Sequence, residues 1–198
     1  MKNVASLRMK NENYKIHEQS RIHSSFFIFH SSLLFRKMAE ELNIIEGTKE
    51  EKYEALLKQI ESVVADESDI IANMANVALM IHETFHFWWT GFYRVISDKE
   101  LVLGPFQGPL ACTRIRKGRG VCGTAWAEAK TQVVPDVDLF PGHIACSSAS
   151  RSEIVVPLFD KKDEVFAVLD IDSTELNTFD ETDKLYLEKI ADLMKNEE

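Results

Sequence analysis

One stretch decides how this chain is expected to fold: Val165-Phe166-Ala167-Val168-Leu169-Asp170-Ile171-Asp172, an apolar strand ending in two carboxylates. Alternate residues of a strand share a face, so the odd-numbered positions should face one way and the even-numbered positions the other. Both faces begin apolar, which predicts burial on both sides. Asp170 and Asp172 would then stand together at the mouth of a half-buried site. Like charges there raise each other's pKa unless a cation, such as a ligand ammonium, lies between them.

The two acids have a plainer interpretation, in which the strand simply emerges into solvent at Asp170. Glu153 opens the preceding strand and is a candidate third acid. The residues by themselves leave both interpretations open.

Other sequence patterns predict the helices and strands that precede and follow this strand. Thr48 followed by Glu51 is typical of a capping box, and an apolar stripe predicts a helix to about Ala65. Asp69 is expected to cap a second helix. Further along we expect strands at 85–96, 101–106, 111–116, 131–134, 153–159 and 165–171, a short helix at 121–129, a loop at 135–150, and a final helix from Asp180. The order predicts an α+β domain with a mainly antiparallel sheet of about six strands, with helices packed on it.

Composition sets limits on the class of protein. The chain has 198 residues, 45% of them hydrophobic, and a formal net charge of −9. An acidic surface disfavours nucleic acid and anionic membranes as partners, and no run of 18 apolar residues exists. Residues 1–37 differ, with seven Lys or Arg and two acids. We interpret 1–37 as a disordered leader, a mis-assigned extension before Met38, and 38–198 as the domain.

Three cysteines, Cys112, Cys122 and Cys146, have the spacing C-x9-C-x23-C. An odd number without a cleavable signal favours a reducing compartment and free or transient thiols, so we expect a cytoplasmic protein. Zinc, with His143 as a fourth ligand, fits this spacing poorly, and no metal is expected. Burial as small apolar side chains is the plain alternative.

Two features favour redox chemistry at these cysteines. Cys112 and Cys122 lie beside Arg114, Arg116, Lys117 and Arg119 in the sequence, and nearby cations stabilise the reactive thiolate. Cys122 is also predicted near a helix N-terminus, which acts in the same direction. Cys146 falls in a polar loop, where a core thiol would be unusual.

An aromatic run adds a possible binding surface. Trp89, Gly91 and Tyr93 should share one face of a strand, with Gly91 leaving a gap between two rings. Such a gap is able to receive an apolar or cationic ligand group, although core packing is the commoner use of such rings.

Six segments together resemble one family: Trp89-Thr90-Gly91-Phe92-Tyr93, Leu103-Gly104-Pro105-Phe106-Gln107-Gly108, Gly120-Val121-Cys122-Gly123-Thr124-Ala125, Val134-Pro135-Asp136-Val137, His143-Ile144-Ala145-Cys146 and Leu169-Asp170-Ile171-Asp172-Ser173. They look like the free methionine-(R)-sulfoxide reductases, which are stand-alone GAF-domain enzymes. The resemblance covers about residues 48–194 and is specific, because ordinary GAF domains lack the cysteine trio.

The resemblance implies a GAF-like fold and thiol-dependent reduction of free methionine (R)-sulfoxide, without a cofactor. Cys146 matches the attacking cysteine, which becomes a sulfenic acid, and Cys112 the main resolving cysteine, which forms a disulfide with it. Cys122 matches a third cysteine, an alternative resolver. Thioredoxin would reduce the disulfide, and the protein would be a homodimer. The substrate pocket implied by the resemblance consists of Glu153, Asp170, Asp172, Trp89 and Tyr93.

Two other functions use the same features. A non-catalytic GAF module would bind a ligand and signal through an attached effector domain, for which this chain has no room. A thiol redox sensor would use the same cysteines without turnover. Activity with each epimer of free methionine sulfoxide separates these possibilities.

Overall fold

Two helices begin at the caps that the sequence indicates. In a computed structural model of the chain, which describes residues 41–143 and 148–195, helix α1 spans Lys49–Val64 and helix α2 spans Ile70–Phe85. The N–H of Glu51 donates to Thr48 Oγ1 at 3.2 Å, and the N–H of Thr48 donates to Glu51 Oε2 at 2.8 Å. Both orphan donors of the first turn are thus satisfied, and the predicted capping box is confirmed.

The second helix runs further than predicted. Asp69 accepts from two backbone N–H groups of its first turn, as expected of an N-cap. The helix continues to Phe85 and ends where His86 takes a left-handed conformation with φ of 56°. The strand expected from Phe85 therefore starts only at Trp89.

Six strands form one sheet in the order β3-β2-β1-β6-β5-β4, and every neighbouring pair is antiparallel. The strands are β1 Trp89–Val95, β2 Glu100–Gln107, β3 Arg114–Arg116, β4 Gln132–Val134, β5 Ser152–Phe159 and β6 Val165–Ser173. A short 3-10 helix, η1 (Val137–Leu139), lies in the predicted loop. The predicted α+β class with a six-stranded antiparallel sheet is confirmed.

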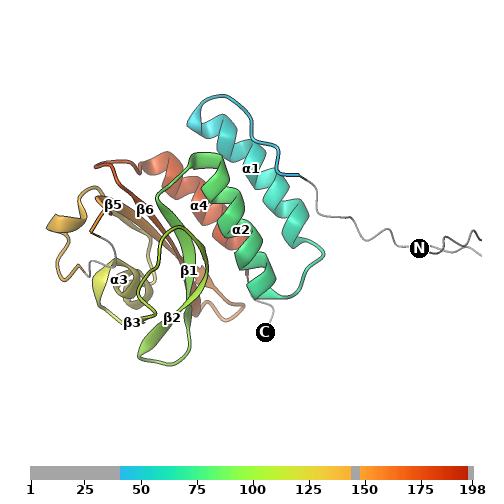
Figure 1. Cartoon of the computed structure of the whole chain (residues 1–198). Coiled ribbons are helices and arrows are strands. Elements are labelled where there is room, and N and C mark those ends of the chain that lie inside the picture. Colours follow the sequence, from blue (N-terminus) through green and yellow to red (C-terminus); the bar gives the residue numbers. More distant parts are fainter. Residues whose placement is uncertain (1–40, 144–147, 196–198) are drawn as a thin grey trace, which may run out of the picture. The chain divides into compact units, whose positions relative to one another are not determined.

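Helices cover both faces of this sheet (Figure 1). Helices α1, α2 and α4 (Glu181–Leu193) pack on one face, where Tyr53, Met74 and Leu187 join a core cluster that also contains Leu169. The short helix α3 (Gly120–Glu128) packs on the other face. Since both faces are covered, the central strands are buried on both sides.

The alternation predicted for β6 holds over most of the strand. Ala167, Leu169 and Ile171 belong to the cluster under the three helices, and Val168 faces the α3 side. The first two positions are reversed: Phe166 packs with the three-helix cluster and Val165 with the α3 side. The β5–β6 register shifts at this point, and the extra residue of such an irregularity reverses the phase of the side chains.

A partly buried ion pair joins helices α1 and α4. Lys49 Nζ lies 2.5 Å from Asp183 Oδ2, and the Tyr53 hydroxyl donates to Asp183 Oδ1 at 2.9 Å. Asp183 is fully buried. A buried carboxylate is tolerated because both oxygens have partners, so this contact fixes α1 against α4.

Several predictions lie outside the described residues: the leader 1–37, the start at Met38, and the loop position of Cys146. Within 41–143 and 148–195, no helix is long and apolar enough to cross a membrane.

Candidate active site

Strand register brings the three predicted acids to one face. Glu153 on β5 pairs with Asp172 on β6, and Val155 pairs with Asp170. Directly opposed residues of an antiparallel pair share a face, as do positions two apart on one strand. Glu153, Asp170 and Asp172 therefore all face the α3 side of the sheet. They line one pocket, so the alternative in which the strand emerges into solvent at Asp170 is excluded.

The aromatic strand β1 lies directly beside these acids. Trp89 pairs with Asp172, Gly91 with Asp170 and Tyr93 with Val168. Trp89 and Tyr93 line the same pocket, and their rings stack with centroids 5.9 Å apart. The predicted common face of the two aromatics is confirmed.

The gap above Gly91 is not a ligand site, contrary to the sequence-based interpretation. A Cβ at Gly91 would lie 2.4 Å from Phe106 Cβ and 2.6 Å from the Trp89 ring. The Trp89 ring also stacks on Phe106 at 5.4 Å between centroids. The protein's own side chains fill the space, so glycine serves here to let β1, Trp89 and Phe106 pack closely.

The polar ends of both aromatic side chains bind the segment that precedes and includes Cys112. Trp89 Nε1 donates to the carbonyl of Pro109 at 3.1 Å, and the Tyr93 hydroxyl donates to the carbonyl of Cys112 at 3.0 Å. Pro109, Leu110 and Ala111 line the pocket, and Cys112 is half-buried and disulfide-bonded. The aromatic wall thus also positions this cysteine.

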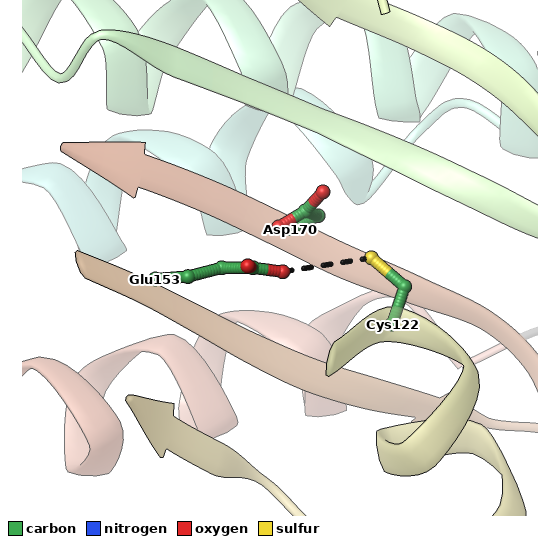
Figure 2. Close-up of side chains that lie close together, drawn as sticks. All are labelled: Cys122, Glu153 and Asp170. Atoms are coloured by element: carbon green, nitrogen blue, oxygen red, sulfur yellow. Dashed lines mark hydrogen bonds between the residues drawn. The ribbon is translucent and has the colours of Figure 1, made fainter. Parts of the chain in front are cut away.

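Helix α3 brings the thiol of Cys122 to the acids (Figure 2). Its Sγ donates to Glu153 Oε1 at 3.9 Å, and ligand atoms of Cys122, Glu153 and Asp170 all lie within 4.8 Å of one another. The three residues are only 4%, 7% and 6% exposed. Such burial makes each charge in the cluster costly.

Burial and mutual charge shift the pKa values of Glu153 and Asp170 upward. Burial raises the pKa of Glu153 well above its ordinary range, and the charges of Asp170 and Asp172 raise it further. Burial and the charge of Asp172 likewise raise the pKa of Asp170. Both shifts favour the protonated form, and a carboxyl group that holds a proton is able to donate it to a bound molecule.

Asp172 differs from its neighbours because it has a dedicated donor. Burial raises its pKa to about 6, while a hydrogen bond from the Ser150 hydroxyl acts in the opposite direction. Asp172 is therefore mostly ionised at pH 7. The pocket combines one charged carboxylate with two that favour the protonated form.

The expected activation of Cys122 by nearby cations is wrong. Cys122 does sit in the first turn of α3, but burial raises the pKa of its thiol, and the charges of Asp170 and Glu153 raise it further. The cationic side chains adjacent in sequence, including Arg114 and Arg116, are exposed. Cys122 is a free, protonated thiol rather than a reactive thiolate.

Further residues join the site. Ser150 was not predicted, and nothing in the sequence marks it as a partner of Asp172. Arg119 and His143 were considered only as a thiolate-stabilising cation and as a zinc ligand, yet both line the pocket. His143 Nδ1 also lies 3.0 Å from the Val137 carbonyl. Cys146, the predicted nucleophile, lies outside the described residues.

Comparison with known proteins identifies the family. A GAF domain model matches residues 64–196. GAF domain-containing protein A of Dictyostelium discoideum is 60% identical over 80% of this chain and all of its own length. Free methionine-R-sulfoxide reductase of Escherichia coli is 45% identical over 72% of this chain and 86% of its own.

A solved structure agrees. Free methionine-R-sulfoxide reductase from Neisseria meningitidis, in complex with its substrate, is 56% identical, with a TM-score of 0.76 over 78% of this chain and 93% of its own. The chain belongs to the GAF-domain family of free methionine-R-sulfoxide reductases.

Proposed function

We propose that the protein reduces free methionine (R)-sulfoxide to methionine. The observation that carries the proposal is the triad of carboxylates in one pocket, with Glu153 and Asp170 buried, beside a thiol and an indole wall, in a chain from this family. A sulfoxide oxygen leaves as water only if protons are supplied, and protonated acids in a pocket are suitable donors.

Recognition of the free amino acid follows from the charges of the pocket. Asp172 carries the negative charge that pairs with the substrate ammonium, which a residue within a peptide lacks. Arg119 is the one Lys or Arg among the described lining residues and is the candidate partner for the substrate carboxylate. Trp89 packs against the S-methyl group, since sulfur–aromatic contacts are favourable. A peptide-bound substrate would leave these charges unpaired and bind weakly.

The reaction proceeds in three balanced steps. The thiolate of Cys146 bonds to the sulfoxide sulfur while the Glu153–Asp170 pair supplies a proton to the sulfoxide oxygen. The oxygen then passes to the Cys146 sulfur as the bond between the two sulfurs and the substrate S–O bond break, which leaves methionine and a Cys146 sulfenic acid. The Cys112 thiol then attacks the sulfenic sulfur, which releases water and forms a disulfide. A thioredoxin dithiol reduces that disulfide by exchange and is itself oxidised.

The states of the two described cysteines support this division of roles. Cys112 is disulfide-bonded, whereas Cys122 is a buried free thiol with a raised pKa. A protonated thiol attacks slowly, so Cys122 acts in reserve as an alternative resolver. Thioredoxin as the reductant and a homodimeric assembly belong to this proposal.

One coupled assay tests the function. The protein is supplied with thioredoxin, thioredoxin reductase and NADPH, and then with each epimer of free methionine sulfoxide and with a peptide carrying the R epimer. We expect NADPH consumption with the free R epimer alone. A folded, fully reduced protein that consumes no NADPH would contradict the proposal and leave a ligand-binding GAF module or a redox sensor as the better description.

A further inference from the structure

Three side chains in the pocket form a set of metal-ligating atoms. The Sγ of Cys122 on α3, a carboxylate oxygen of Glu153 on β5 and one of Asp170 on β6 all lie within 4.8 Å of one another (Figure 2). Neighbouring ligands of tetrahedral zinc stand roughly 3.5 Å apart, given bond lengths of about 2.0–2.3 Å. The Sγ–Oε1 separation is 3.9 Å. Small changes in side-chain rotamers would bring the three ligand atoms within bonding distance of one ion.

A second observation points to a ligand at the same place. Asp170 is 6% exposed, and its Oδ1 has no hydrogen-bond partner among the described residues. Buried polar atoms nearly always have a partner, so an orphaned carboxylate oxygen beside a thiol and a second acid indicates that a cationic group completes this site.

The donor set selects the kind of cation. Magnesium and calcium prefer six or more oxygen ligands, and this site offers carboxylate oxygens from only two residues. The sulfur ligand favours a softer, thiophilic ion, and three protein ligands with a fourth position open are typical of zinc. We propose that Cys122, Glu153 and Asp170 bind a thiophilic divalent cation of the Zn²⁺ type, and that this ion excludes the amino-acid substrate.

This metal is an inhibitor and not a cofactor. The proposed reduction routes electrons through thiols alone, and the ion would engage the two acids that serve as proton donors. The Cys122 proton and the protons held by Glu153 and Asp170 leave to solvent as the ligand–metal bonds form. The metal site itself does not depend on the proposed reductase activity; only the exclusion of substrate rests on it. The ligands also differ from the three-cysteine set with His143 that the sequence disfavours.

Cobalt is a suitable probe, because thiolate ligation to Co²⁺ produces an intense near-ultraviolet charge-transfer band. The full chain is prepared with Cys112→Ser and Cys146→Ser, so that Cys122 is its only cysteine. We expect Co²⁺ to produce the band, Zn²⁺ to abolish it by displacement, and added Cys122→Ser to eliminate it. Asp170→Asn and Glu153→Gln should each weaken Co²⁺ binding at least about tenfold. Glu83→Gln, which removes an exposed carboxylate on α2, should leave binding unchanged.

The outcomes separate the two proposals. Absence of the band in the protein with Cys122 alone, or a band unchanged in both carboxylate variants, overturns the metal site. Free methionine sulfoxide should raise the apparent dissociation constant for Co²⁺ in proportion to its concentration. If it does not, the ion does not exclude the substrate. Co²⁺ binding to the protein with Cys122 alone, together with no reductase activity of the wild-type protein, would refute the proposed function and retain the metal site.

Discussion

The Ser150 hydroxyl donates a hydrogen bond to Oδ1 of Asp172, although the two residues lie 22 positions apart. Ser150 comes just before β5 and Asp172 near the end of β6. The charge of Asp172 raises the pKa of the nearby Asp170 and so disfavours ionisation of Asp170. This one donor therefore helps to divide the acids of the pocket into a charge-bearing group and proton-holding groups.

Removing that donor should alter the pH dependence of activity. In Ser150→Ala the pKa of Asp172, already about 6, should rise further, so less of the group is ionised near neutral pH. We expect KM for methionine sulfoxide at pH 6 to rise about tenfold and the acid limb of kcat/KM to move to higher pH. Steady-state assays from pH 5 to 8 measure both. Ser148→Ala, at an exposed position, is the matched control, and identical profiles for both variants would refute the role of Ser150.

Neutralising Asp170 should stabilise the protein at high pH. Its folded pKa is raised, so the folded state binds more protons than the unfolded state, and stability falls as pH rises above about 4. Asp170→Asn removes this loss. We expect the variant to be more stable than wild type at pH 8, by about 1 kcal/mol or more, and the difference to shrink at pH 5. Urea unfolding at both pH values provides the test, with Glu83→Gln as the control. If the difference in unfolding free energy between Asp170→Asn and wild type is the same at pH 5 and pH 8, the raised pKa of Asp170 is contradicted.

Tyr93→Phe should loosen the segment that carries Cys112. The change removes the hydrogen bond to the Cys112 carbonyl and keeps the buried ring, at a cost of about 1 kcal/mol. We expect slower disulfide formation after a single turnover, while release of the first methionine keeps its rate. Rapid-quench measurement of both steps distinguishes them. Tyr186→Phe, which removes a hydroxyl on the three-helix face, should change neither rate.

The three cysteines should differ in single-turnover behaviour. Cys146→Ser should reduce no substrate. Cys112→Ser should reduce about one equivalent per chain and hold a sulfenic acid that a dimedone-type reagent traps, because the protonated thiol of Cys122 resolves it only slowly. Cys122→Ser should retain most of the thioredoxin-dependent turnover, because its buried thiol is only a reserve. Retained activity in Cys146→Ser would reject it as the nucleophile.

Lys49→Met should lower stability without affecting the site. It removes the cation beside the fully buried Asp183 and leaves that carboxylate with the Tyr53 hydroxyl and the backbone N–H of Asp180. Removing one partner of a fully buried pair destabilises a protein by about 3–5 kcal/mol. Because Lys49 is partly exposed, we expect a smaller loss of about 2 kcal/mol in the free energy of unfolding. Thermal unfolding measures the loss, and unchanged kcat below the transition is the expected control. A simultaneous fall in kcat would show that the α1–α4 contact reaches the pocket.

Much of the site could be predicted because it depends on strand periodicity. Alternation along β6 places Asp170 and Asp172 on one face, and that is where they lie. The prediction for Cys122 failed for a tertiary reason. Its cationic neighbours are close only in sequence, whereas Glu153 and Asp170 approach from other strands and reverse the sign of the local field. The phase of Phe166 and the partner of Asp172 likewise depend on a register shift and a loop, which a single sequence does not specify.

The alternation in β6 also means that the strand tolerates substitutions far better than insertions or deletions. A one-residue deletion between Val168 and Asp170 would carry the two acids into the layer under the three helices and turn Ile171 toward the pocket. Fold and reactivity would then be lost in the same event. In members of this family we therefore expect substitutions within this stretch but no insertions or deletions. The register shift near Phe166 shows that one extra residue is accommodated at the start of β6, before the acids.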